Sequence, residues 1–387
     1  MAGAAEDDAA RSVTALPQAP GPNSDASAEG HQETLADLGE WELIRRLGAF
    51  APPGQFADDA ALLYLPGNGA ATGGPALVVN TDVLVEGMHF SDATTAAADV
   101  GWRAAAANLS DLAAMGCTEV VGITVGLVAP ASTPWSWVEG VYGGLREALD
   151  AYGGVLLGGD CSGGAQRLLA ITAIGRLGGV APSERAASGQ KPEAATRGPI
   201  RRSDGRPGDR LVCTGPHGLS RLGLAVLQGE IPARERDPAL VQRAITAHQR
   251  PRPRFDAVRA LSACRPAAEP WRLGGCDSSD GLAAAVGAIA GASGCAARLQ
   301  RTCLPFDPAM ADLPEAQAWC LGGGEDFELV LALAPPWAEA LIAALPGSTR
   351  IGELVAGEAG ALGWSDGTAW NAGDGKSGAG SGYSHFS

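Results

Sequence analysis

The chain has 387 residues, of which 46% are hydrophobic, and this is enough for two globular domains that each have a core. Its 28 basic and 43 acidic residues give a net charge of −15. So acidic a chain, with no basic stripe, is unsuited to binding nucleic acid or an anionic membrane surface. A nucleotide remains possible as a ligand, because bound metal ions can invert the local sign of charge.

The N-terminal segment predicts a disordered tail. Residues 1–36 are rich in Ala, Asp, Glu, Pro and Ser and show no hydrophobic periodicity. The first residues are acidic where a signal peptide would be basic, and no apolar run reaches the roughly 18 residues of a membrane span. The eight cysteines form no Cys-x-x-Cys pair, and most lie in apolar runs. We therefore predict a cytoplasmic protein in a reducing compartment.

Residues 37–180 alternate between short apolar runs and amphipathic segments, which predicts an N-terminal α/β domain. We expect helices at 40–47, 99–115 and 135–152, and strands at 76–79, 122–127, 155–157 and 168–176. Asn108 and Asp111 are one turn apart in the second helix and should therefore lie on one of its faces. Polar residues follow two of these strands, as Asn80-Thr81-Asp82 and as Gly158-Gly159-Asp160. The strand before Gly158 is expected to be buried, and strand ends are where α/β folds build their sites.

Residues 181–200 break the pattern with Pro, Ser, Gly, Gln and Lys, so we expect an insertion or linker there. Residues 201–387 are the predicted C-terminal domain, and the whole is an α/β (α+β) protein. Its expected strands are 210–214, 327–333 and 350–354, and its expected helices are 220–227, 240–248, 281–290 and 337–345. Residues 371–382 are rich in Gly and Ser and predict a flexible segment.

Six aspartates lie in short polar patches next to these apolar runs, and taken singly each could be a helix cap or a turn residue. They are Asp59, Asp82, Asp111, Asp160, Asp277 and Asp280. Unit charges about 4 Å apart repel by several kcal/mol at an effective dielectric constant near 20, so a convergent cluster would need cations. Hard oxygen ligands suit Mg²⁺, and carboxylate-bound Mg²⁺ usually holds a phosphate. The first hypothesis is therefore phosphoryl transfer.

Local motifs leave the type of nucleotide site open. Gly158-Gly159-Asp160 could let a phosphate approach the backbone, or could be a plain tight turn. Ser279 could cap the helix that follows it, or the helix N-terminus could bind a phosphate. Gly375-Lys376-Ser377 resembles the end of a P-loop, but Trp370 replaces the required first glycine, so any ATP site must be of another type.

In their order along the chain, these segments resemble thiamine-monophosphate kinase, a member of the ATP-binding superfamily that includes aminoimidazole ribonucleotide synthetase. The likeness runs from about residue 38 to the end. It rests on Asp58–Leu62, Asn80–Phe90, Asn108–Gly116, Gly158–Asp160, Arg202–Asp209, Asp277–Leu282, Gly323–Leu329 and Gly382–Phe386.

The resemblance implies a two-domain fold, with a homodimer built through the N-terminal sheets. It implies transfer of the ATP γ-phosphate to thiamine monophosphate, which gives thiamine diphosphate and ADP. The implied Mg²⁺ ligands are Asp59, Asn80, Thr81, Asp82, Asp111, Asp160, Asp277 and Asp280, and the expected catalytic residues among them are Asp111, Asp277 and Asp280. The implied ATP contacts are Tyr142, Gly159, Asp160, Arg202 and Ser279. The implied substrate contacts are His89, Glu325 and Tyr383.

The chain departs from the family pattern at a few positions. Ala57 replaces a Gly, Asn80 replaces a Ser but still offers an oxygen, and Leu219 stands where the family has an acid. The alternatives are a selenophosphate synthetase-like enzyme, an aminoimidazole ribonucleotide synthetase-like enzyme, or an inactive nucleotide-binding module. The first usually carries a reactive Cys near its N-terminus, whereas no Cys precedes Cys117 here, and the second lacks the Glu-Gly-x-His-Phe pattern of Glu86–Phe90. The acids argue against an inactive module, because clustered unpaired carboxylates would lower its stability without serving a function.

Overall fold

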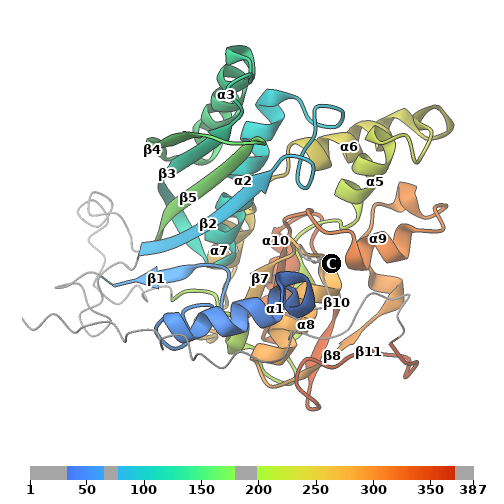
Figure 1. Ribbon diagram of the computed structural model, residues 1–387. Helices are drawn as coiled ribbons and strands as arrows, with labels where there is room; N and C mark the ends of the chain where they lie inside the picture. Colours follow the sequence, from blue (N-terminus) through green and yellow to red (C-terminus); the bar gives the residue numbers. More distant parts are fainter. Residues whose placement is uncertain (1–32, 65–76, 179–197, 371–387) are drawn as a thin grey trace, which may run out of the picture.

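The computed structural model describes residues 33–64, 77–178 and 198–370 (Figure 1). These ranges leave out most of the expected tail and most of the 181–200 insertion. They also leave out the Gly/Ser segment and Tyr383. The first described element is α1 (Leu35–Leu47), whose N-cap Thr34 forms a capping box with Asp37. No helix in the described ranges combines the length and the hydropathy that crossing a bilayer requires.

The N-terminal domain is a five-stranded sheet with the strand order β1-β2-β5-β3-β4. Its strands are β1 (Ala61–Leu63), β2 (Leu77–Val85), β3 (Cys117–Ala129), β4 (Val155–Gly163) and β5 (Leu168–Leu177). Only β3 and β4 pair in parallel, and the other neighbours are antiparallel. Two helices, α2 (Ala97–Ala114) and α3 (Trp135–Tyr152), pack together on one side of this sheet (Figure 1).

The predicted strands exist, but β2, β3 and β4 run further than expected. Asn80–Asp82 lies inside β2 and Gly158–Asp160 lies inside β4, so neither patch follows the end of its strand. The expectation of a buried strand before Gly158 is also wrong, because β4 is exposed along its whole length. As an edge strand it has a neighbour on one side only, and its apolar residues Val155, Leu156 and Leu157 are each about half exposed.

The C-terminal domain contains a six-stranded sheet with the order β11-β8-β10-β6-β9-β7. Its strands are β6 (Arg210–Cys213), β7 (Gly274–Asp277), β8 (Ala296–Leu299), β9 (Leu329–Leu333), β10 (Thr349–Val355) and β11 (Leu362–Trp364). Its helices are α5 (Leu219–Leu227), α6 (Pro238–Gln249), α7 (Phe255–Ala263), α8 (Leu282–Ala292), α9 (Ala316–Gly322) and α10 (Pro335–Ala344). The elements that periodicity missed, β1, β7, β8, β11, α7 and α9, are three to nine residues long, too short to show a period.

One apolar core continues from the first domain into the second. Leu109 of α2 and Ile123 of β3 belong to the same buried cluster as Leu261 of α7 and Trp337 of α10. All four side chains are fully buried, so the two domains meet through packed hydrocarbon. The interface therefore holds functional groups from both domains at fixed positions.

Helices α2 and α3 approach closely because glycines stand at their contact. A Cβ atom on Gly144 would lie 1.8 Å from the carbonyl oxygen of Ala98, and one on Gly101 would lie 1.9 Å from that of Val141. A methyl group at either position would force the helix backbones apart. The position of α2, which faces the second domain, therefore depends on these two glycines.

Gly144→Ala should accordingly destabilise the protein by about 2 kcal/mol or more, because α3 must move away from α2 to accommodate the methyl group. Gly143→Ala is the matched control on the same helix, since a Cβ there meets nothing within 4 Å. That control should be neutral or stabilising by up to about 1 kcal/mol, the usual gain from Gly to Ala in a helix. Urea unfolding of both variants provides the measurement, and equal stabilities would contradict the close-packing argument.

Candidate active site

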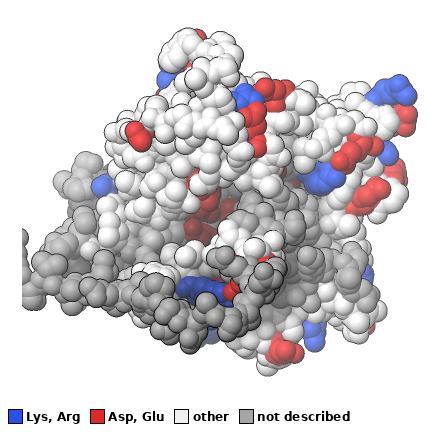
Figure 2. Space-filling view, viewed as in Figure 1, with Lys and Arg blue, Asp and Glu red and all other residues white. Residues whose placement is uncertain are grey.

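A cavity of about 500 Å³ opens between the two domains, a volume suited to a ligand of nucleotide size. Acidic side chains are visible on the floor of a hollow in the middle of this face (Figure 2). The polar residues that line this cavity are Glu40, Gln55, Asp58, Asp59, Asn80, Thr81, Asp82, Asp111, Arg202 and Asp280. Trp41 and Ile44 of α1, together with Phe56, add an apolar wall.

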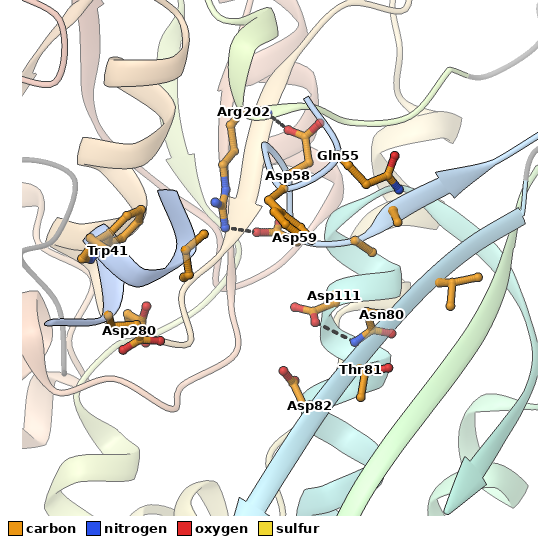
Figure 3. A pocket seen from close by; sticks show the side chains of 16 residues that line it. Trp41, Gln55, Asp58, Asp59, Asn80, Thr81, Asp82, Asp111, Arg202 and Asp280 are labelled. Atoms are coloured by element: carbon orange, nitrogen blue, oxygen red, sulfur yellow. Dashed lines mark hydrogen bonds and ion pairs between the residues drawn. The ribbon is translucent and has the colours of Figure 1, made fainter. Parts of the chain in front are cut away.

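Asp59 precedes β1, and its side chain is almost fully buried beside Arg202 (Figure 3). The Arg202 guanidinium donates to one carboxylate oxygen of Asp59, and the backbone N–H of Asp277 donates to the other at 3.3 Å. The neighbouring Asp58 accepts from the backbone N–H of Arg202 at 2.9 Å. Arg202 therefore joins the N-terminal acids to the C-terminal domain.

Strand β2 and helix α2 bring a second group of polar side chains to the same cavity (Figure 3). The Asn80 amide nitrogen donates to Asp111 at 2.7 Å and to the Asn108 side-chain oxygen at 3.3 Å. That Asn108 oxygen also accepts from the backbone N–H of Asp82 at 3.1 Å. The expectation that Asn108 and Asp111 share one face of a helix is confirmed by these common partners.

Asp277 ends β7 and reaches the cluster from the second domain. It is buried, and its carboxylate accepts from the Ser110 hydroxyl at 2.7 Å and from the Ser279 backbone N–H at 3.3 Å. Ser279 does not cap the following helix, because the N-cap of α8 is Gly281, with φ 102°. The loop from Asp277 to Gly281 instead places Asp280 at the cavity wall.

The carboxylates of this acidic cluster, Asp59, Asp82, Asp111 and Asp277, perturb one another. Burial raises the pKa of Asp111 well above its usual range, and repulsion from Asp82, Asp277 and Asp59 raises it further. Burial also raises the pKa of Asp59 to about 7, although Arg202 opposes the shift, and it raises the pKa of Asp277. The cluster therefore holds more negative charge than Arg202 can balance.

The donor set fits a hard divalent cation. It consists of carboxylate oxygens, and the buried side-chain oxygen of Asn80 accepts no hydrogen bond in the part of the chain described. In the same ranges, no three His, Cys, Asp or Glu side chains already surround one metal position. Binding of a cation would therefore require these side chains to move.

Three of the predicted site residues, Tyr142, Gly159 and Asp160, lie outside the lining of this cavity, and a fourth, Thr81, lines it but has its hydroxyl bonded to a neighbouring strand. Thr81 alternates with Asn80 and Asp82 along β2, and its hydroxyl is hydrogen-bonded at 2.8 Å to Thr172 across the sheet. Gly159 and Asp160 lie on the exposed strand β4, outside the cavity lining. Tyr142 lies on α3, where burial raises the pKa of its hydroxyl and the nearby Cys161 of β4 raises it further.

A second, smaller cavity of about 90 Å³ brings His89 and Glu325 together from the two domains. Its walls also include Met88, Phe90 and His248. The Nδ1 atom of His89 accepts from the Val85 backbone N–H at 3.0 Å. A neutral His89 therefore carries its proton on Nε2 and is a hydrogen-bond donor there.

Sequence reasoning missed three residues that support these cavities. Arg103 pairs with Glu325 at 2.6 Å, Ser110 binds Asp277, and the buried His217 ring contacts the Ser278 hydroxyl at 2.9 Å. One signal was available for Arg103, since it is the lone charge in the Ala-rich apolar stretch 100–110. His217 offered none, because its partner is 61 residues away.

Without divalent cations, Asp111→Asn should increase the free energy of unfolding at pH 8, because it removes a carboxylate that its neighbours repel. The folded-state pKa of Asp111 lies above the unfolded value of 3.8, so ionisation of this group costs the wild type stability as the pH rises above that value, and the variant lacks this contribution. The gain should be about 1.4 kcal/mol for each unit of pKa shift and should disappear near pH 4.

Chemical unfolding in EDTA at pH 5 and pH 8 measures this difference. Asp150→Asn is the matched control, since it removes an exposed acid at the end of α3, and its effect should stay within about 0.5 kcal/mol at both values. A variant Asp111→Asn that is less stable than the wild type at pH 8 would contradict the repulsion described above.

Both halves of the chain match domains of one family. Residues 57–177 match the AIR synthase related protein, N-terminal domain, and residues 206–365 match the AIR synthase related protein, C-terminal domain. The solved structure of AaThiL complexed with AMPPCP and TMP superposes with a TM-score of 0.72 at 25% identity, and the match covers 92% of this chain and 100% of that one. The two-domain α/β fold expected from the resemblance is thereby confirmed.

Two curated relatives match along most of their length. The thiamine-monophosphate kinase of Prochlorococcus marinus is 46% identical over 346 residues, which cover 88% of this chain and 95% of the relative. The thiamine-monophosphate kinase of Synechococcus elongatus is 47% identical over 309 residues, which cover 80% of this chain and 86% of the relative. Together with the two domains and the acidic cavity between them, these matches show that the chain belongs to the thiamine-monophosphate kinase family.

Proposed function

We propose that this protein transfers the γ-phosphate of ATP to thiamine monophosphate and releases thiamine diphosphate and ADP. The observation that carries the proposal is that Asp59, Asp82 and Asp111 of the first domain and Asp280 of the second line one cavity, with the buried Asp277 beside them, in a chain of this family. AaThiL binds AMPPCP, a non-hydrolysable analogue of ATP, together with TMP. The family relationship favours this reaction over the selenophosphate synthetase-like, aminoimidazole ribonucleotide synthetase-like and inactive alternatives.

The larger cavity is the proposed site for the ATP phosphates and for Mg²⁺. Asp59, Asp82, Asp111, Asp277 and Asp280 would supply carboxylate oxygens to the metal, and Asn80 would add its unpaired amide oxygen. Bound Mg²⁺ would neutralise the phosphate charge that this acidic cavity otherwise repels. Arg202 and Ser279 lie beside these acids, where a guanidinium and a hydroxyl would contact phosphate oxygens.

The smaller cavity is the proposed site for thiamine monophosphate. Its carboxylate, Glu325, suits either the cationic thiazolium ring or the amino group of the pyrimidine ring. His89 would donate its Nε2 proton to an acceptor atom of the same molecule. Tyr383 remains the predicted third contact and lies outside the described residues.

The transfer is proposed to be direct and in line. A phosphate oxygen of thiamine monophosphate forms a bond to the γ-phosphorus as the bond from that phosphorus to the β–γ bridging oxygen breaks, and the electron pair remains on ADP. The attacking phosphate is already ionised near pH 7, so no strong general base is needed. His89 is not placed to act as a base, because its Nδ1 lone pair accepts a hydrogen bond from the Val85 backbone N–H and its Nε2 atom carries a proton.

A homodimer through the N-terminal sheets would explain the residues that this protomer leaves apart. Val155, Leu156 and Leu157 expose an apolar edge on β4, next to Gly159 and Asp160. Covering that edge with a second subunit would bury these side chains and could carry Gly159, Asp160 and Tyr142 to the partner's cavity. All eight cysteines are free thiols, which supports the proposed cytoplasmic location.

The activity assay is Mg²⁺-dependent release of ADP on addition of thiamine monophosphate, with thiamine diphosphate identified by chromatography. Asp111→Asn should lower kcat at least about 100-fold while the protein stays folded, because the lost carboxylate is a metal ligand. Asp150→Asn, an exposed acid on α3, should retain the wild-type rate. ADP release that ignores thiamine monophosphate, or wild-type turnover in Asp111→Asn, would reject the proposal. A phosphorylated enzyme intermediate would reject the direct transfer.

The dimer is tested by Leu156→Glu, which places a charge on the exposed apolar edge of β4. Sedimentation velocity should show a shift from dimer to monomer at micromolar concentration, with a parallel loss of turnover. Trp135→Glu is the control, since it places the same charge on an apolar side chain that is 72% exposed at the start of α3 and not on β4. If Leu156→Glu remains a dimer, β4 is not at the subunit interface.

A further inference from the structure

The guanidinium of Arg103 is buried directly behind the smaller cavity. Arg103 lies in the middle of α2 and is only 3% exposed. It donates to the Glu325 carboxylate at 2.6 Å, to the His89 backbone carbonyl at 3.4 Å and to the His248 backbone carbonyl. All three acceptors belong to residues that line the cavity. One side chain thus connects a loop after β2, the end of α6 and the loop before β9.

Glu325 is held against Arg103 by a strained loop. Glu325 and Phe327 have φ values of 57° and 52°, in the left-handed region that costs a non-glycine residue about 1 kcal/mol or more. The Glu325 backbone N–H donates to the Ser279 carbonyl at 2.7 Å, and Asp326 accepts from the backbone N–H groups of Gly218 and Ser220. These bonds hold the strained conformation and direct the Glu325 side chain to the domain interface.

The ion pair is one-sided, which leaves part of the carboxylate for a ligand. Arg103 contacts the Oε1 atom of Glu325, whereas the Oε2 atom lies 3.6 Å from the His248 ring. Burial and the nearby Arg103 together lower the pKa of His248 to about 4, although Glu325 opposes the shift, so this ring is neutral near pH 7. The Glu325 side chain remains 34% exposed at the cavity. The Glu325 carboxylate is therefore held by Arg103 through one oxygen and remains accessible from the cavity.

Helix α2 also connects this pair to the acidic cluster. Ser110 lies seven residues after Arg103, two helical turns along the same face, and it binds Asp277. The same face of one helix thus contacts the carboxylate of the smaller cavity at one point and a member of the acidic cluster beside the larger cavity about 10 Å further on. The relative position of the two cavities depends on this face of α2.

We propose that Arg103 is a positioning residue for the phosphate acceptor, which acts by holding the Glu325 carboxylate in the geometry that binds the cationic or amino-bearing rings of thiamine monophosphate. The inference rests on the proposed function. Arg103 does not itself line the cavity and is connected to it through its bonds to His89, His248 and Glu325, so its role is to position the carboxylate. Lysine cannot replace it fully, since an ammonium group lacks the planar fork that reaches three acceptors.

The test is a double-mutant cycle with Arg103→Met, Glu325→Gln and the combined variant. Arg103→Met should raise the KM for thiamine monophosphate at least about tenfold and leave the KM for ATP within about twofold. In the Glu325→Gln background the same change should have little further effect, because the group that Arg103 positions is already lost. Arg103→Lys should fall between wild type and Arg103→Met and keeps the test available if Arg103→Met does not fold.

Arg272→Met is the matched control. It removes another part-buried arginine, whose ion pair with Asp209 at 2.6 Å lies in the C-terminal domain outside the lining of both cavities. Its two KM values should match those of the wild type. Calorimetric titration of thiamine monophosphate without ATP gives a second readout, in which Arg103→Met should weaken binding by the same factor as its KM.

Two outcomes would overturn the inference. Equal increases in the KM values for ATP and thiamine monophosphate would mean that Arg103 supports the interface as a whole. Multiplicative effects of Arg103→Met and Glu325→Gln would mean that it does not act through that carboxylate. A folded wild type that neither binds nor phosphorylates thiamine monophosphate would instead reject the proposed function and is recognised before any variant is compared.

Discussion

Mutual repulsion among Asp59, Asp82, Asp111 and Asp277 is the constraint on which the rest of this structure depends. These carboxylates come from the segment before β1, from β2, from α2 and from the end of β7, so four separate segments must be held against an unfavourable electrostatic energy. Hydrogen bonds from Asn80 and Ser110, and the ion pair with Arg202, provide part of the restraint. The remaining charge matches the requirement of the proposed reaction, which brings a polyphosphate and a phosphate monoester together with divalent cations.

The apolar framework supplies the rigidity that such a cluster needs. Glycines at the contact of α2 and α3 let the two helices pack closely, and one continuous core extends from α2 and β3 to α7 and α10. A close-packed interface cannot deform gradually, so the acids of one domain keep their positions relative to those of the other. Apolar packing at the interface therefore offsets the unfavourable electrostatic energy of the acidic cluster.

Helix α2 has more than one role at that interface. Asp111 serves the acidic cavity, Ser110 holds the acid of the second domain, and Arg103 holds the carboxylate of the smaller cavity. A single rigid element that contacts both cavities fixes the distance between them. For direct phosphoryl transfer this matters, because the two reacting groups must meet in line within a few tenths of an ångström.

Much of this could be predicted from the sequence. Helical periodicity placed Asn108 and Asp111 on one face, the order of the acidic segments indicated the family, and the bounds of α3 agree with those expected. Local patterns could not show that β2 and β4 continue through their polar patches. For this reason Thr81 was grouped with Asn80 and Asp82, although alternate residues of a strand lie on opposite faces. The apolar run at 155–157 was expected to be buried, although it lies exposed at a sheet edge. Nor could local patterns pair Arg103 with a carboxylate 222 residues away. Types of residue and their local spacing are properties of the chain alone, whereas burial, the face of a strand and the partner of a charge depend on which distant segments pack together, and only the tertiary structure decides that.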